Sequence, residues 1–194
     1  MGKIYYVMGK SASGKDTIYK RLVKKMPELG TVRMYTTRPI RDGETNGVEY
    51  IFTDEKQLQA MKDAGKVIEC RTYDTIYGPW SYFTADDGQI DLGSCSYLMM
   101  GTLESYEGLC KYYGAEVMVP LYIHVEDGVR LQRALNRENT QKNPKYAEMC
   151  RRFLADEKDF SKENLKRLNI TDKIVNDSVE NALREIFLRI KSGR

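Results

Sequence analysis

The stretch Gly9-Lys10-Ser11-Ala12-Ser13-Gly14-Lys15-Asp16 decides the fold. It follows Ile4-Tyr5-Tyr6-Val7-Met8, which predicts a buried strand, and it precedes a helical pattern of apolar residues that ends at Pro27. A strand, a glycine-bounded loop and a helix form the context that a phosphate-binding P-loop needs. The loop amides can turn towards a polyphosphate, and the helix N-terminus adds its positive dipole end. Lys15 can then reach the β- and γ-phosphates.

The last position of this motif departs from the usual pattern. A Ser or Thr normally follows the lysine and binds Mg²⁺ through its hydroxyl, whereas this chain has Asp16. A carboxylate is also a hard oxygen ligand, so we predict that Asp16 holds Mg²⁺ directly or through water. The alternative is a simple strand-to-helix turn in which Asp16 only favours the first helical turn. The two glycines, the lysine and the flanking strand favour the phosphate-binding loop.

Length and composition set modest limits on function. The chain of 194 residues is long enough for one unit with a buried core. The 31 basic and 28 acidic residues leave a net charge of +3, which is too small to indicate a nucleic-acid partner. Four scattered cysteines and one histidine argue against a zinc site and indicate reduced thiols. No apolar signal-peptide core and no membrane-length apolar run is found, so we expect a cytoplasmic protein with no membrane partner.

Strand and helix patterns alternate along the chain, which predicts an α/β domain with a largely parallel sheet. Further core strands are expected at residues 95–100, 117–125 and 173–175, each followed by a helical pattern. The helical pattern after residue 128 is heavily charged and runs to about residue 167.

Residues 32–85 are rich in short strand patterns and lie between the first and second parts of this core. Strands are expected at 31–37, 47–52 and 66–73. Asp54, with Gln57 three residues later, resembles a capping box that begins one helix. We therefore expect a small lobe inserted into the parallel core.

A second block of sequence makes a family resemblance specific. Residues 35–52 read Tyr-Thr-Thr-Arg-Pro-Ile-Arg-Asp-Gly-Glu-Thr-Asn-Gly-Val-Glu-Tyr-Ile-Phe. This block resembles the guanylate kinase pattern T-T-R-x-x-R-x-G-E-x-x-G-x-x-Y-x-F at nearly every defined position. Ile68-Glu69 and Tyr77-Gly78 are similar to further elements of that family, and the arginines after residue 127 are similar to its lid. Residues 174–177, Ile-Val-Asn-Asp, resemble its V-x-N-D strand end.

The resemblance implies a P-loop NTPase core with a central, mainly parallel five-stranded sheet flanked by helices. It implies one guanylate kinase-like domain over residues 1–194. The core is expected at residues 1–31, 86–126 and 158–194, with a strand-rich acceptor-binding lobe at 32–85 and a helical lid at 127–157.

The resemblance also implies ATP-dependent, Mg²⁺-assisted phosphoryl transfer to a nucleoside monophosphate, with ATP and GMP giving ADP and GDP. No pattern predicts the oligomeric state. The residues that match the family's ATP-binding positions are Gly9, Ser11, Ser13, Gly14, Lys15, Asp16 and Asn176. Those that match its acceptor-binding positions are Arg38, Arg41, Tyr50, Glu69 and Tyr77. The catalytic role falls to Lys15, Arg38, Arg133, Arg137 and Arg152.

The positions that recognise the base agree less well. In the family a Glu accepts hydrogen bonds from the N1–H and amino group of guanine, and Glu69 matches it. Met34 stands where the family has Ser, and Pro79 stands where it has Ser or Thr. A further Asp of the family has no counterpart, with Thr102 and Glu104 as the candidates to replace it. Such sites discriminate through satisfied hydrogen bonds, so the acceptor's identity is open.

Two alternatives therefore stand beside GMP phosphorylation. One is a kinase for another small phosphorylated acceptor, such as a different nucleotide or a sugar phosphate. The other is a catalytically weak binding module of the same fold, which Asp16 favours and Lys15 opposes.

Overall fold

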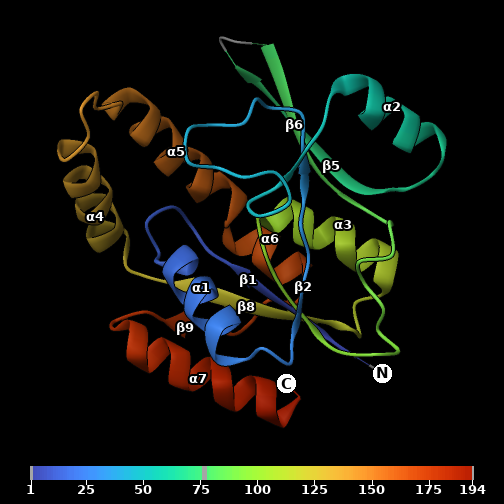
Figure 1. The fold of residues 1–194 in the computed structure, drawn as a ribbon. Helices are drawn as coiled ribbons and strands as arrows, with labels where there is room; N and C mark the ends of the chain where they lie inside the picture. The colour runs from blue at the N-terminus through green and yellow to red at the C-terminus, as the bar shows by residue number, and fades with distance from the viewer. Residues whose placement is uncertain (1, 76–77, 194) are drawn as a thin grey trace.

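A parallel sheet of five strands forms the centre of the chain (Figure 1). The structure is a computed structural model that describes residues 2–75 and 78–193. The strand order is β2-β7-β1-β8-β9, and every neighbouring pair in it runs parallel. The strands are β1 (Ile4–Met8), β2 (Gly30–Thr31), β7 (Tyr97–Met100), β8 (Met118–His124) and β9 (Ile174–Val175). The predicted fold class is confirmed.

The sheet is covered by helices on both faces, as the sequence of β1 requires. Side chains of a strand alternate between faces, and every residue of β1 is buried. Ile4, Tyr6 and Met8 pack in an apolar cluster with α3 (Leu103–Tyr113). Tyr5 and Val7 pack in a second cluster on the other face. That cluster includes α1 (Lys15–Lys25) and α7 (Val179–Ser192).

A second, mixed sheet has the order β4-β3-β6-β5. Its strands are β3 (Tyr35–Thr36), β4 (Ile51–Phe52), β5 (Val67–Thr75) and β6 (Gly78–Ala85). Helix α2 (Glu55–Asp63) packs Leu58 in a small cluster with Phe83 of β6. The predicted helix start is confirmed, because the Asp54 carboxylate accepts a hydrogen bond from the Gln57 N–H at 2.8 Å. The reciprocal half of a capping box is replaced: the Gln57 side chain accepts from the Thr53 hydroxyl at 2.6 Å.

Two predicted strands of this region differ from the structure. The strand expected at 31–37 is divided, because the chain leaves the parallel sheet after β2 and joins the second sheet only at β3. The strand expected at 47–52 is shortened to β4. Gly47 there adopts a left-handed φ of 82°, and the Val48 N–H bonds the Thr45 carbonyl in a turn.

The charged segment after β8 forms three helices, α4 (Asp127–Asn139), α5 (Tyr146–Asp159) and α6 (Lys162–Arg167). The connection between α4 and α5 contains Pro144, which cannot continue a helix interior. Figure 1 shows α4 and α5 on one side of the molecule and the second sheet with α2 on the other. Of the helices in residues 2–75 and 78–193, none combines the length and apolar character needed to cross a membrane.

Candidate active site

The P-loop lies at the carboxyl end of β1, where it turns into α1. Ala12 and Gly14 both have left-handed backbones, with φ of 61° and 85°. Such turns direct successive N–H groups into an anion-binding concavity. A Cβ on Gly14 would lie 2.5 Å from Nδ2 of Asn176, so glycine is required there by both backbone and space. That amide nitrogen donates a hydrogen bond to the Ser13 carbonyl at 2.7 Å, so the buried Asn176 side chain fixes the loop.

Three groups of the P-loop remain available to a ligand. The side chains of Lys15 and Asp16, the first two residues of α1, form no hydrogen bond or ion pair with any residue of the described ranges. The buried Ser13 hydroxyl likewise has no partner among them. A free ammonium and an unsatisfied hydroxyl suit phosphate oxygens, and an exposed carboxylate suits a hard cation.

A divalent cation has little protein support beyond Asp16. Within the described chain, no cluster of three or more His, Cys, Asp or Glu side chains is arranged to hold a metal. Mg²⁺ usually takes one or two carboxylates and completes its shell with substrate phosphates and water. The single carboxylate of Asp16 therefore fits a cation that arrives with a polyphosphate.

Arg130 of α4 anchors the P-loop to the two helices beside it. Its side chain is only 1% exposed and lies over the Phe153 ring of α5 at 4.6 Å. Its guanidinium donates to the Ser11 carbonyl at 3.0 Å and pairs with Asp127 and Glu157, each at 2.7 Å. A buried guanidinium needs this many acceptors to offset its lost hydration.

A second link joins the P-loop directly to α5. The Ser11 N–H donates to the Asp156 carboxylate at 2.7 Å, and Lys10 Nζ lies 2.6 Å from Glu157. The sequence patterns did not predict Asp156, Glu157 or Arg130 as part of the site. The one local signal was the i, i+3 spacing of Asp127 and Arg130 on one helix.

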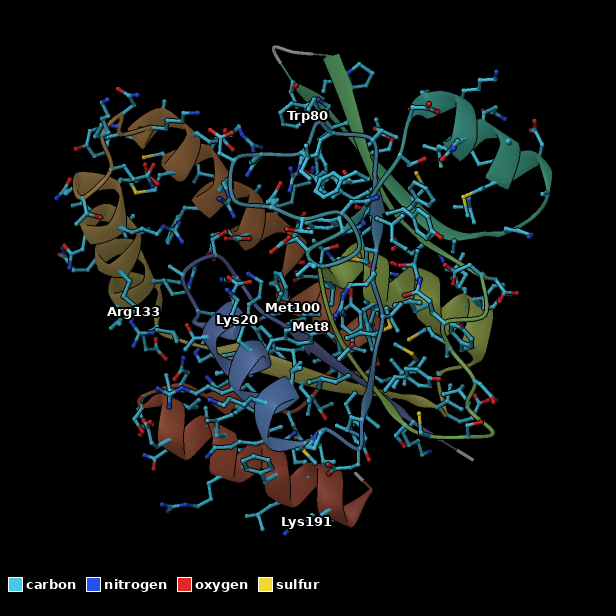
Figure 2. All side chains as sticks on the ribbon, in the orientation of Figure 1. Met8, Lys20, Trp80, Met100, Arg133 and Lys191 are labelled. Atoms are coloured by element: carbon cyan, nitrogen blue, oxygen red, sulfur yellow. The ribbon has the colours of Figure 1, made fainter. Side chains whose placement is uncertain are left out.

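A cavity of about 250 Å³ lies beside the P-loop. Three of the predicted arginines, Arg41, Arg137 and Arg152, line it together with Ser11. Arg133 also lies on α4 (Figure 2), but it is exposed and does not line this cavity. The charged lining residues are Arg41, Arg137, Glu138, Lys145, Glu148 and Arg152. The excess of basic groups makes the cavity suitable for anionic ligands.

Arg38 is held rigidly instead of lying free. Its side chain is 3% exposed, and its two terminal nitrogens donate to the two Glu44 oxygens at 2.7 and 2.5 Å. The guanidinium also lies over the rings of Tyr50 and Phe52, at 5.3 and 5.2 Å. The hydrogen bonds from Arg38, helped by the Arg41 N–H, lower the pKa of Glu44 to about 2. Glu44 is thus ionised at neutral pH and orients the guanidinium of Arg38, while it accepts from the backbone N–H of Arg41.

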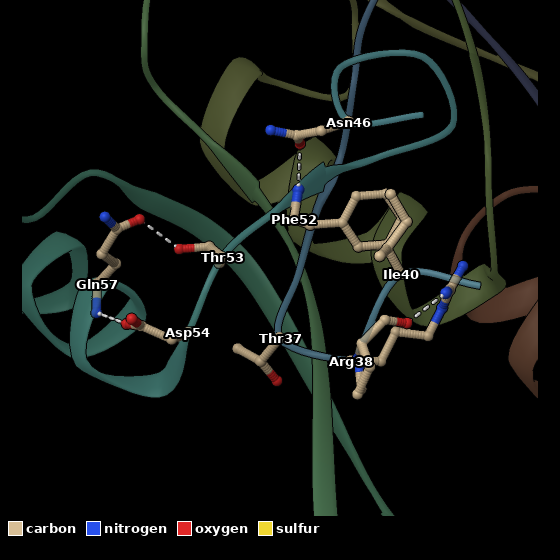
Figure 3. Close-up of a pocket in the computed structure, with 9 residues that line it drawn as sticks. Thr37, Arg38, Ile40, Asn46, Phe52, Thr53, Asp54 and Gln57 are labelled. Carbon is tan, nitrogen blue, oxygen red and sulfur yellow. Dashed lines mark hydrogen bonds between the residues drawn. The ribbon is translucent and has the colours of Figure 1, made fainter. Parts of the chain in front are cut away.

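A larger, open cavity of about 490 Å³ lies in the second sheet and the start of α2 (Figure 3). It is lined by residues 37–40, 46, 52–54 and 57. Arg38 and Phe52 line it, but no residue is shared with the cavity beside Ser11. Its polar side chains mainly bond their own neighbours: Asn46 accepts from the Phe52 N–H, and Thr53 donates to Gln57. We therefore place the chemistry at the smaller cavity.

Glu69 lies buried in β5 and its carboxylate is already bonded. One oxygen accepts the Thr84 hydroxyl at 2.7 Å, and the other accepts Nε of Arg71 at 3.0 Å. A Cβ added to Gly108 of α3 would lie 2.5 Å from the Cβ of Glu69. Glu69 is therefore wedged between the second sheet and the core.

Arg71 is a neighbour of Glu69 that the sequence patterns did not predict. Its side chain is 6% exposed, and it donates to the Thr102 hydroxyl at 2.9 Å and to the Met34 sulfur at 3.7 Å. Burial disfavours its charge, but the negative charge of Glu69 and other neighbours leaves its pKa raised. The available signal was the spacing of two between Glu69 and Arg71, which places both on one face of a strand.

Pro79 lies away from this cluster. In the β5–β6 hairpin, Pro79 pairs with Asp74 and Thr84 pairs with Glu69. The hydroxyl expected near Glu69 therefore comes from Thr84 and not from position 79. Tyr77, a predicted acceptor-binding residue, lies outside the described residues.

Comparisons with known proteins agree with this arrangement. Residues 1–81 match the sequence model of the family described as "Guanylate kinase". A guanylate kinase from Salinibacter ruber is 27% identical over 190 residues, which span 93% of this chain and 91% of that relative. This chain is therefore similar to guanylate kinases, in a family model over residues 1–81 and at 27% identity over most of its length.

Two further comparisons show how the guanylate kinase resemblance is distributed. A guanylate kinase from Legionella pneumophila (strain Lens) is 37% identical over 78 residues, but these span only 40% of this chain and 37% of that relative. The crystal structure of guanylate kinase from Anaplasma phagocytophilum matches with a TM-score of 0.65 at 16% identity. This structural match covers 99% of this chain and 86% of the Anaplasma phagocytophilum chain. The fold is thus shared along the chain, while sequence similarity is concentrated in the first 81 residues.

The residues that match guanylate kinase positions fall into two groups in the structure. Lys15 and Asp16 lie together at the P-loop, and Arg41, Arg137 and Arg152 meet at the cavity beside it. Met34 and Glu69, at positions where the resemblance predicts base recognition, and Thr102, one of two candidates to replace the missing Asp, all contact the guanidinium of Arg71.

Proposed function

We propose that this chain transfers a phosphoryl group from ATP to a nucleoside monophosphate, with GMP as acceptor and GDP and ADP as products. The carrying observation is the meeting of the P-loop with Arg41, Arg137 and Arg152 at one basic cavity. Phosphoryl transfer needs little covalent chemistry from the protein and depends on positioning and charge stabilisation. A phosphate-binding loop facing three arginines supplies both.

At the donor end, the P-loop amides and Lys15 hold the β- and γ-phosphates of ATP. Gly9, Ser13 and Gly14 shape the loop, and Asn176 fixes it through the Ser13 carbonyl. Asp16 holds Mg²⁺ directly or through water, and this ion neutralises charge on the phosphates when it is bound.

At the acceptor end, Arg41 and Tyr50 bind the acceptor's phosphate, and Arg38 is set in place by Glu44 for the same purpose. Bidentate guanidinium groups suit phosphate recognition. Residues 32–85 act as the acceptor-binding lobe, closing on the core over the two substrates.

Residues 127–157 act as the lid. Arg137 and Arg152 cover the transferring group and exclude water, so that ATP is not hydrolysed. Arg133, four residues before Arg137 on α4, joins them only when the lid closes further.

We place this activity in the cytoplasm. The four cysteines, Cys70, Cys95, Cys110 and Cys150, are free thiols in the structure, which fits a reducing compartment. Its proposed partners there are small-molecule nucleotides, ATP and GMP.

A coupled assay of ADP release tests the proposal with ATP–Mg²⁺ and GMP, dGMP, AMP, CMP or UMP, beside a no-acceptor control. The expected result is ADP release that depends on the acceptor and is fastest with GMP and dGMP. Binding of ATP–Mg²⁺ without acceptor-dependent turnover would overturn the proposal and favour a binding module.

A further inference from the structure

We propose that Asp156 of α5 is an internal competitor of the phosphate groups of ATP at the P-loop. Its carboxylate holds the Ser11 N–H of the loop, and the phosphates of the donor displace it when they bind. This inference rests on one part of the proposed function, the binding of ATP at the P-loop. It adds a step that limits entry of the donor and couples the donor to the position of α5.

The first observation is the partner of the Ser11 N–H. Successive N–H groups of a phosphate-binding loop are donors for the oxygens of an anion. In this protein the Ser11 N–H already donates to a carboxylate oxygen of Asp156 at 2.7 Å, although the two residues are 145 positions apart. A carboxylate and a phosphate offer the same kind of charged oxygen, and a hydrogen bond to either is charge-assisted. Asp156 therefore occupies a loop donor that an anionic ligand can use.

The second observation is the charge around this contact. Three carboxylates, those of Asp127, Asp156 and Glu157, share two cations, Lys10 and Arg130. The pair between Asp156 and Arg130, at 3.7 Å, is the longest of these ion pairs. The Asp156 side chain is only 17% exposed, so water screens its charge incompletely. A polyphosphate that enters the loop adds negative charge beside Asp156, and the repulsion drives the carboxylate away from Ser11.

The third observation concerns the helix that carries Asp156. No residue of α5 is buried, so the helix can shift with little loss of apolar contact. Arg152 lies four residues before Asp156, and the two side chains therefore share one face of α5. Arg152 and Ser11 both line the cavity beside the P-loop. Phosphates repel the carboxylate and attract the guanidinium on that face, so binding of the donor exchanges Asp156 for Arg152.

The competition sets the sign of one measurable effect. The donor binds only the fraction of molecules in which Ser11 has been released, and its apparent affinity is reduced by that fraction. Removing the negative charge of Asp156 should therefore tighten binding of the donor. A contact that only supports the loop would have the opposite effect, because its loss would weaken binding.

The test is equilibrium binding of ATP–Mg²⁺ and of tripolyphosphate, without acceptor, to the wild-type protein and to Asp156→Asn. Asparagine keeps the size of the side chain and removes its charge, and tripolyphosphate carries the phosphates without a nucleoside. We expect Kd for both ligands to fall by about 5- to 20-fold, as for weakening of a hydrogen bond to a charged group. Asp156→Glu keeps the carboxylate and should stay within about threefold of wild type. Asp156→Ala provides the same comparison if Asp156→Asn does not fold.

Asp159→Asn is the matched control. Asp159 is an exposed aspartate on the same helix, and its carboxylate forms no hydrogen bond with a described residue. This variant removes the same charge without removing the contact to Ser11, so Kd should stay within about twofold of wild type. The thermal unfolding midpoint of each variant shows that the fold survives.

Unchanged or weaker binding of both ligands by folded Asp156→Asn protein would overturn the inference, because the carboxylate would then not oppose the donor. Equal tightening in Asp159→Asn would also overturn it, since general charge would explain the effect. Acceptor-dependent release of ADP by the wild-type protein separates the two proposals. Tighter binding by Asp156→Asn without such turnover removes the proposed function and leaves the role of Asp156, and turnover with unchanged affinity does the opposite. If neither protein binds ATP–Mg²⁺, both proposals fail.

Discussion

At the proposed donor end of the site, the side chains of Lys15 and Asp16 have no hydrogen-bond or ion-pair partner among the described residues. At the proposed acceptor end, the side chains of Glu69 and Arg71 are paired with each other. The donor end therefore keeps its charges for a ligand. At the acceptor end the two charges already form an ion pair within the protein. A ligand binds there only if its hydrogen bonds are stronger than the contacts it replaces. A free charge accepts any polyphosphate of the right size, but a charge that is already bonded discriminates. We infer that the unpaired charges bind the donor, ATP, and that the paired charges select the acceptor.

The largest effect is expected from removing the free ammonium at the donor end. Lys15→Ala should lower kcat by about 10²- to 10³-fold, because a preorganised charge on the transferring group is lost. The matched control is Lys20→Ala, an exposed lysine on the same helix (Figure 2), which should leave kcat within twofold. Steady-state kinetics with ATP–Mg²⁺ and GMP make the measurement. Equal rates in both variants would contradict the assignment of the donor end.

A smaller effect is expected at the basic cavity beside the P-loop. Arg152→Ala should lower kcat by about 10²-fold through lost positioning, with release of inorganic phosphate rising as water enters. Arg151→Ala is the control, because Arg151 is its neighbour in sequence, pairs with Glu148 and does not line the cavity. If Arg151→Ala loses as much activity as Arg152→Ala, the cavity is not the site of transfer.

The smallest effect is a pH dependence of stability at the acceptor end. The pKa of Glu44 is lowered from 4.5 to about 2, chiefly by Arg38. Its contribution to stability is complete above pH 4.5 and is lost as the pH falls towards 2, because the unfolded chain takes up the proton first. Glu44→Gln removes this dependence, so the gap in unfolding midpoint between wild type and variant should narrow from pH 7 to pH 3.

Glu28→Gln, at an exposed position after α1, serves as the control for that measurement. It should show no gap in unfolding midpoint at either pH. A Glu44→Gln gap that stays constant between pH 7 and pH 3 would show that the Arg38–Glu44 pair does not stabilise the fold.

The donor end could be predicted from sequence because its signals are local. The strand of residues 4–8, the glycines of the P-loop and the helix after Lys15 follow one another directly. The helix start at Asp54 is equally local and could be predicted for the same reason. Such features depend on a few adjacent residues, so a single sequence contains them.

The acceptor end could not be predicted in the same way because its bonds join distant segments. Thr84 is 15 residues from Glu69, and Thr102 is 31 residues from Arg71. The register of the β5–β6 hairpin decides which hydroxyl meets Glu69, and the motif pointed to Pro79 instead. The contact of Ser11 with Asp156 spans 145 residues and was equally hidden. Of these contacts, only the one between Glu69 and Arg71 could be predicted from sequence, because the two residues are two positions apart on one strand.

The central claim is that the P-loop and the basic cavity together pass a phosphoryl group from ATP to a nucleoside monophosphate. A single-turnover reaction with ATP labelled on its γ-phosphate, Mg²⁺ and GMP tests it most directly, by following where the label goes. We predict that the label appears in GDP, and that it does not appear there with Lys15→Ala on the same timescale. Label found only in inorganic phosphate, or retained in ATP, would contradict the account.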